Sequence, residues 1–186
     1  MRVLLKQPAF LSIVLAAVET FKKECFGYIL GKTDDKGFVA EHSIPMQTAK
    51  RKYNSVENID NRQKIVTAIC GLFWKSSQII GDFHSHPRFQ SNDRRDMSSP
   101  SDSDAHDSKE GHVYFIAVIE QKKKRQRWKV TKDGGISGTL GDFKIKIRAF
   151  YAPQDRTLEP IKISCPTIYK LNALKELDNR IQTRYT

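Results

Sequence analysis

The stretch GDFHSHPRFQSNDRRDMSSPSDSD, residues 81–104, holds two histidines, a proline directly after them and a Ser-x-x-Asp within one short span. The residues that lead into it, 78–83, are β-prone and predict a strand. Side chains two positions apart on a strand face the same side, so His84 and His86 should point together. Because Pro87 has no backbone N–H for a strand ladder, we expect the strand to end there.

Two imidazoles on one face supply half of a zinc site. Taken alone, the pair fits a metal site and two ordinary histidines about equally well. The pattern Ser101-x-x-Asp104 is also that of a helix N-terminal cap, with Ser101 on the free amides and Asp104 in the first turn. A carboxylate held in a first turn can still face a cation, so the cap and the metal ligand are compatible interpretations.

Length and composition are those of one globular domain. The chain has 186 residues, of which 39% are hydrophobic and 28% charged. No run reaches the roughly 18 apolar residues of a membrane span, and the apolar stretch 9–18 is too periodic for a signal peptide. The formal net charge of +11 favours acidic partners or nucleic acid through long-range attraction, and says nothing about the fold.

The three cysteines, Cys25, Cys70 and Cys165, are widely spaced and odd in number, with no C-x-x-C. This pattern is typical of reduced, partly buried thiols in a reducing compartment. Together with the lack of a membrane span, it predicts a soluble cytoplasmic protein.

Hydrophobic periodicity predicts an alternation of helices and strands. Predicted helices cover 8–22, about 60–75, two turns after Ser101, and the tail from Thr167. Predicted strands cover 24–31, 38–44, 78–86, 113–119, about 128–130, 143–150 and 161–163, the last as an edge strand. The continuous apolar run 113–119 is typical of a central strand covered on both faces. Residues 45–63 are polar and aperiodic and predict a long loop.

Three separated pieces of this chain, taken in order, resemble a known family. Glu24, then His84-Ser85-His86-Pro87, then Pro100-Ser101-x-x-Asp104 are similar to the signature of the JAMM/MPN+ (JAB) zinc peptidases, and the chain looks like their prokaryotic stand-alone members. The resemblance covers roughly residues 8–150. It implies an α/β fold with a mixed, curved β-sheet flanked by helices, similar to cytidine deaminases, in a domain over 1–166 followed by an amphipathic helix over 167–186.

The resemblance also implies the roles of the site residues. Zn²⁺ would be held by His84, His86 and Asp104, with the fourth position left to water. Glu24 would act as general base on that water, and Ser101 would donate to the developing oxyanion. One feature departs from the family: residues 87–100 form a metal loop of about twice the usual length.

Other residues compete for these roles. Ser99-x-x-Asp102 is a second register of the same pattern, but the Pro100-Ser101 pair matches the family and favours Asp104. Glu19 and Glu41 are weaker candidates for the base. We interpret the remaining candidates as solvated charges or structural histidines: Asp93, Asp96, His42, His106 and His112.

The implied reaction is hydrolysis of a peptide or isopeptide bond after the C-terminal tail of a ubiquitin-like protein, with that protein or its conjugates as partner. Two alternatives remain: a catalytically silent MPN-type scaffold, and another metallohydrolase acting on nucleic acid. The basic segment 122–127 is an exposed turn or a surface for an acidic protein. Only Trp128 lies near it, so a nucleic-acid stacking platform is missing and nucleic acid is the weaker expectation. The sequence leaves the oligomeric state open.

Overall fold

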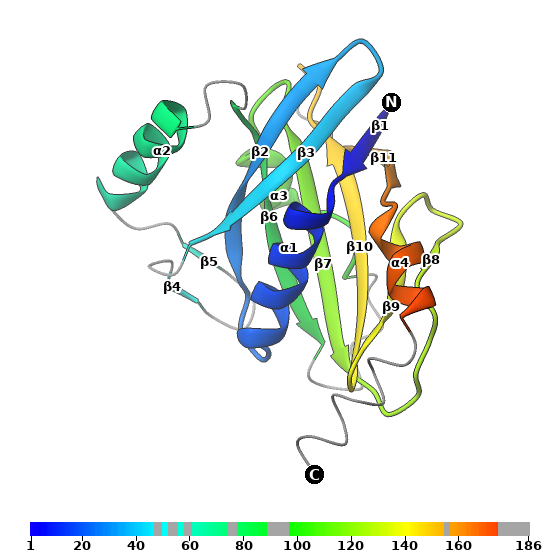
Figure 1. Ribbon diagram of the computed structural model, residues 1–186. Coiled ribbons are helices and arrows are strands. Elements are labelled where there is room, and N and C mark those ends of the chain that lie inside the picture. Colours follow the sequence, from blue (N-terminus) through cyan, green and yellow to red (C-terminus); the bar gives the residue numbers. More distant parts are fainter. Residues whose placement is uncertain are drawn as a thin grey trace.

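The computed structural model describes residues 1–46, 50–51, 56–57, 61–73, 78–88, 97–154 and 157–174 (Figure 1). In chain order the elements are β1 (Arg2–Leu5), α1 (Gln7–Glu19), β2 (Phe26–Asp34), β3 (Gly37–Pro45), β4 (Lys50–Arg51), β5 (Val56–Glu57), α2 (Asn61–Phe73), β6 (Gln78–Arg88), α3 (Asp102–His106), β7 (Val113–Gln121), β8 (Lys129–Val130), β9 (Ile136–Leu140), β10 (Phe143–Tyr151), β11 (Glu159–Ser164) and α4 (Thr167–Ala173). The fold class is therefore mixed α/β, as predicted.

A nine-stranded mixed sheet, in the order β11-β1-β3-β2-β6-β7-β10-β9-β8, forms most of the molecule. β11 pairs with β1 on one side and with β10 on the other, so the sheet curves back on itself into a barrel-like core. The prediction of an edge strand at 161–163 was therefore wrong. Ile161 and Ile163 are buried, and a strand with two buried apolar side chains is better satisfied between two neighbours than at an open edge.

The two faces of the sheet bury different residues. Along β7, Phe115, Ala117 and Ile119 belong to the main core, in which α1 lies against the sheet (Figure 1). Tyr114 and Ile116, on the other face, pack in a separate apolar cluster with Phe150. β7 is thus buried on both faces between β6 and β10, which confirms the prediction from its continuous apolar run.

The hairpin of β2 and β3 also follows the prediction. Its turn is closed by the backbone N–H of Lys36, which donates to Asp34 Oδ1 at 2.8 Å. Gly37 follows with φ of +132°, and a Cβ there would lie 2.1 Å from the carbonyl oxygen of Arg2. Only glycine allows this backbone conformation beside β1.

Helix α1 ends at Glu19, three residues before the predicted end at 22. The α-helical pattern ends after Thr20, whose N–H donates to the carbonyl of Ala16 at 3.1 Å: the next N–H, that of Phe21, bonds the carbonyl of Val18 at 3.2 Å, and Lys22 has φ of +84°. Phe21 therefore lies outside the helix, where its ring packs edge-on against Phe143 with centroids 5.0 Å apart. The apolar periodicity continued past the true end because Phe21 still faces the core.

Strand β6 passes through Pro87 and ends at Arg88, so the expected stop at the proline was wrong. The N–H of Ser85 points to the β2 side, where it donates to the carbonyl of Cys25 at 3.0 Å. Position 87 has the same orientation, but the described pairing between β2 and β6 stops at His84. The missing N–H of Pro87 is therefore on the side where the described pairing with β2 has already stopped, so no ladder hydrogen bond is lost there. On the other side, Pro87 still pairs with β7.

The C-terminal helix is docked on the domain as far as residue 174 is described. Ile168 is buried in the main core, and the side chain of Asn172 exchanges two hydrogen bonds with the backbone of Trp128, at 2.9 and 2.7 Å. The rest of the predicted helix over 167–186 lies outside the described residues, and the proposed domain boundary at 166 stays a prediction. β1 and β9 were not predicted, since each is short and lacks a clear alternation.

All three cysteines are buried and free, as expected. Helix α2 buries Cys70 but exposes the apolar side chains of Ile65, Ile69 and Leu72. Among the described residues, no helix is both long and apolar enough to cross a membrane.

Candidate metal centre

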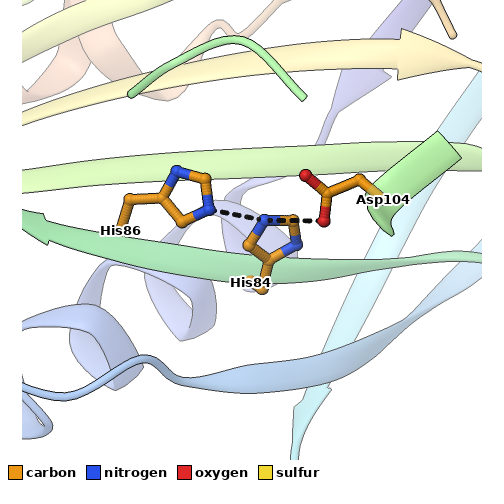
Figure 2. A group of neighbouring side chains, drawn as sticks. All are labelled: His84, His86 and Asp104. Carbon is orange, nitrogen blue, oxygen red and sulfur yellow. Dashed lines mark hydrogen bonds and ion pairs between the residues drawn. The ribbon is translucent and has the colours of Figure 1, made fainter. Parts of the chain in front are cut away.

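The two histidines lie on the face of the sheet opposite to α1. His84 pairs with Ile116 of β7, and His86 pairs with Val118. Gly81 allows this close pairing, because a Cβ at that position would lie 1.7 Å from the carbonyl oxygen of Val113. The pairing of β6 with β7 thereby fixes both imidazoles on one face of the sheet, and Asp104 approaches them from α3 (Figure 2).

His84, His86 and Asp104 form a compact group of donor atoms, all within 4.8 Å of one another. The two Nε2 atoms are 3.0 Å apart, and Asp104 Oδ1 is 3.5 Å from Nε2 of His84. Two atoms bound to one tetrahedral zinc at about 2.1 Å lie roughly 3.4 Å from each other. The donor set and its spacing therefore fit a tetrahedral metal ion, and these three residues can hold one.

The backbone of the long loop orients His86. Nδ1 of His86 lies 2.6 Å from the carbonyl oxygen of Met97, which can only accept a hydrogen bond. Nδ1 must therefore carry the proton, which leaves the lone pair of Nε2 directed toward the metal position.

His84 is in the protonation state that a metal ligand requires. Burial lowers the pKa of its imidazole to about 4; the nearby Asp104 carboxylate opposes this shift, and His86 adds to it. The side chain is 12% exposed. His84 is thus neutral at pH 7, and its free nitrogen can bind a cation.

Asp104 is both a cap and a candidate ligand, as the sequence allowed. Its Oδ2 accepts hydrogen bonds from the backbone N–H and from the hydroxyl of Ser101, at 2.6 and 2.8 Å. The Ser101 oxygen accepts the Asp104 N–H in return, at 3.3 Å, which completes a capping box. Because Oδ2 is occupied, Oδ1 is the oxygen that faces His84. α3 has five residues, which is shorter than the predicted two turns.

Glu24 lies beside the histidines from the loop that precedes β2. Its Oε1 is 3.9 Å from Nε2 of His86, and its side chain is 8% exposed. Burial, with a smaller contribution from the negative charge of Asp104, raises the pKa of Glu24 to about 8. A carboxylate of such raised pKa beside a metal position is suited to proton transfer.

Ser85, between the histidines, holds Glu24 in place. It is fully buried on the core side of β6, where its hydroxyl oxygen accepts the backbone N–H of Cys25 at 2.9 Å. The Ser85 N–H donates to the carbonyl of Cys25 at 3.0 Å. Two hydrogen bonds therefore tie the residue after Glu24 to the strand that carries the imidazoles.

The competing candidates lie elsewhere. Glu41 forms an ion pair with Lys6 at 2.6 Å, and the Ser99 hydroxyl lies 3.1 Å from Arg148 Nη1. His106 is exposed and contacts Asp107. Neither His42 nor His112 belongs to the three-residue donor group found among the described residues. Asp93 and Asp96 lie outside the described residues.

Sequence reasoning missed three parts of this site: Ser85, the Met97 carbonyl and Asp82. Asp82 lies on the histidine face, in register with Tyr28 on β2 and Tyr114 on β7. Burial, then the charge of Asp104, raises the pKa of Asp82 to about 8. The alternation that paired His84 with His86 also places Asp82 on their face and Ser85 on the buried one, so it was the available signal.

Comparisons with known proteins identify the family of this chain and support its fold. The family described as prokaryotic homologs of the JAB domain matches residues 6–131, more than half of the chain. No curated protein matches the sequence. The solution structure of a protein from Desulfitobacterium hafniense is similar with a TM-score of 0.56 and 17% identity, covering 88% of this chain and 92% of that one. A protein from Salinibacter ruber gives a TM-score of 0.48 and 19% identity, covering 87% and 90%. At such low identity, the first of these likenesses shows the fold alone.

Proposed function

The chain belongs to the prokaryotic homologs of the JAB domain, and we propose that it is a zinc-dependent peptidase that cleaves after the C-terminal tail of a ubiquitin-like protein, in deconjugation or precursor processing. One observation supports this most: a two-histidine, one-carboxylate donor group with a buried glutamate 3.9 Å from one of its nitrogens. The cytidine-deaminase-like layout and a cytoplasmic location are parts of the same proposal.

The donors support the choice of zinc. Two imidazole nitrogens and one carboxylate oxygen leave the fourth tetrahedral position open, as in catalytic zinc sites. When bound, zinc polarises the scissile carbonyl and lowers the pKa of its water toward about 7.

The protein groups around it would carry the protons. Glu24 would take a proton from the attacking water as the new C–O bond forms, and would deliver it to the amine as the C–N bond breaks. A carboxylate that burial disposes toward protonation can do both. Ser101 is the proposed oxyanion donor; this role requires its exposed hydroxyl to turn from Asp104 Oδ2 toward the substrate.

The surroundings of the site suggest the kind of substrate. We propose that the segments 45–63 and 87–100, parts of which lie outside the described residues, contribute to the channel for an extended C-terminal tail; the first contains β4, β5 and the start of α2, and the second follows from the last residues of β6. The exposed basic segment 122–127 directly follows β7. Because β7 runs parallel to β6, this segment lies at the same end of the sheet as the C-terminal end of β6, which carries His86 and Pro87. It suits an acidic protein surface on the partner, whereas nucleic acid would require stacking aromatics beside it.

The test compares the wild type with Glu24→Gln in metal analysis and in cleavage of a ubiquitin-like fusion. We expect about one zinc per chain in both proteins, and a loss of cleavage of about 10²–10⁴-fold in the variant, because glutamine keeps the shape but cannot accept a proton. Glu41→Gln is the matched control, since Glu41 pairs with Lys6 and should leave cleavage unchanged.

The alternatives give different results. A wild type that binds zinc and the ubiquitin-like protein but cleaves nothing is a silent MPN-type scaffold. Bound zinc with no cleavage and tight, salt-sensitive nucleic-acid binding identifies another metallohydrolase.

A further inference from the structure

Arg148 lies on the same face of the sheet as the candidate metal centre, two strands away. In the register of the sheet, Arg148 of β10 pairs with Ile116 of β7, which pairs in turn with His84 of β6. Two strand spacings separate their backbones by roughly 10 Å. Arg148 is therefore too far away to bind the metal, but a side chain of its length can reach the loop beside the site.

The guanidinium is fixed at its base. Nε lies 3.4 Å from Asp133 Oδ2, and Cζ lies 4.8 Å from the centre of the Phe150 ring. Only 12% of the side chain is exposed. An arginine held by a carboxylate and an aromatic face loses little further freedom when its terminal nitrogens make additional contacts.

The terminal nitrogen Nη1 of Arg148 contacts the last residues of the long loop. Nη1 donates to the Ser99 hydroxyl at 3.1 Å and, at a longer 3.4 Å, to the carbonyl oxygen of Ser98, a fully buried residue. The preceding residue, Met97, provides the carbonyl that accepts Nδ1–H of His86. The following residues enter the cap that presents Asp104.

Segment 97–99 has no strand ladder to hold it, since it lies between the described end of β6 and α3. Its position therefore depends on individual contacts, and an irregular segment is costly to order without them. Arg148 supplies two of these contacts from the rigid sheet. The neighbouring Lys146 binds the same Asp133 at 2.7 Å but makes no described contact with this segment.

We propose that Arg148 is a positioning residue of the metal centre: by holding Ser98 and Ser99, it sets the Met97 carbonyl that orients His86 and the start of the helix that carries Asp104. This inference deepens the proposed function and rests on it for its role in catalysis. Its physical content, the orientation of one imidazole and the affinity for a metal, can be measured without any substrate.

The experiment uses Arg148→Met, which keeps much of the apolar stem, and Arg148→Lys, which keeps the charge. Lys146→Met is the matched control on the same strand face and the same Asp133. Cobalt(II) affinity and absorption are measured for each protein, and the His86 Nδ1–H signal is followed by NMR in the metal-free proteins. We expect Arg148→Met to bind cobalt about 10–100-fold more weakly, the range for partners that orient metal ligands, and to lose the Nδ1–H signal.

Arg148→Lys should be intermediate, because one ammonium cannot replace the planar fork of the guanidinium. Lys146→Met should stay within about twofold of the wild type. The proposal is overturned if Arg148→Met keeps both the affinity and the Nδ1–H signal, or if Lys146→Met loses as much. A wild type that binds cobalt but cleaves no ubiquitin-like fusion contradicts the proposed peptidase alone. If the wild type binds no cobalt, the metal-centre proposals fail together.

Discussion

The two halves of the candidate site are built in different ways. His84, Ser85 and His86 lie on β6, which pairs with β7 over eight consecutive residues and with β2 on its other side. The loop-borne half, residues 97–104, is held by separate contacts: one from His86, two from Arg148 and a capping box around Asp104.

This difference separates two properties of the site. The strand-borne half is fixed by the fold, so damage there should affect both the stability of the protein and the position of Glu24. The loop-borne half takes no part in the strand pairing of the barrel, so substitutions there should weaken metal binding with only a small loss in the free energy of unfolding. Each prediction below tests this separation, beginning with the largest expected effect.

Ser85→Ala tests the strand-borne half. It removes the acceptor of the Cys25 N–H and leaves a buried donor unpaired, which should lower the free energy of unfolding by about 1–3 kcal/mol. Glu24, next to Cys25, loses an anchor, so kcat for cleavage should fall. Zinc affinity should change little, because the register of β6 and β7 is untouched. Urea unfolding, zinc competition and steady-state kinetics measure the three effects.

Ser137→Ala is the matched control, because Ser137 of β9 is also buried and its hydroxyl donates to a backbone group, the carbonyl of Ile145 on β10, at 3.0 Å. It should destabilise the protein to a similar degree without changing kcat. If Ser85→Ala loses zinc affinity as strongly as it loses kcat, the two halves are not separable.

The strand-borne half was largely predictable from the sequence. Period-two alternation brought His84 and His86 together, and the apolar run of β7 identified the central strand that pairs with theirs. The same alternation also places Asp82 on the histidine face and Ser85 on the core face, but neither was predicted. The predicted strand end at Pro87 was wrong because the sequence alone does not show that the pairing of β2 with β6 stops before this residue.

The loop-borne half was predictable only in its local part. Ser101 and Asp104 are three residues apart, so the sequence alone predicts their capping box. Arg148 and Ser99 lie 49 residues apart and meet through the tertiary fold; an arginine in an alternating strand carries no local sign of its contact. The closure of the barrel by β11 was missed for the same reason, because it joins the two ends of the chain.

Ser101→Ala tests the loop-borne half. It removes a hydroxyl that donates to Asp104 Oδ2 at 2.8 Å and caps α3. Loss of an N-cap should cost about 1 kcal/mol, and loss of a partner of a metal-binding carboxylate should weaken zinc affinity about 10-fold or more. Zinc competition and urea unfolding measure the two effects.

Ser108→Ala is the control here, since its hydroxyl donates to the Ala105 carbonyl at 2.7 Å, beyond Asp104 in the same segment. It should reduce local stability and leave zinc affinity unchanged. Equal losses of affinity in both variants would mean that any loosening of α3 releases the ligand, and that the cap has no specific role.

Asp133→Asn, the smallest expected effect, tests the support of the loop-borne half through pH. Burial acts to raise the pKa of Asp133, but hydrogen bonds from Lys146 and Thr131 and the charges of Lys146 and Arg148 lower it from 3.8 to about 2. Since the folded-state pKa is depressed, this carboxylate stabilises the protein above about pH 4, and the contribution is lost as pH falls toward 2. The shift sets an upper limit of roughly 2 kcal/mol; with 31% of the side chain exposed, we expect less than about 1 kcal/mol.

Urea unfolding of the wild type and Asp133→Asn across pH 2–7 should therefore show a difference in the free energy of unfolding that is constant near neutral pH and disappears as the pH falls toward 2. Cobalt affinity of the variant at neutral pH should fall only a few-fold, less than for Arg148→Met, because Phe150 still holds the guanidinium. Glu120→Gln removes another carboxylate that pairs with a lysine of β10, Lys144, at 3.0 Å, but it is not bound to Arg148 and should leave cobalt affinity unchanged. A difference in unfolding free energy that persists at pH 2 would show that Asp133 stabilises the protein through the geometry of its turn and not through its charge. The ion pairs of Asp133 with Lys146 and Arg148 would then have no part in holding the loop-borne half of the site.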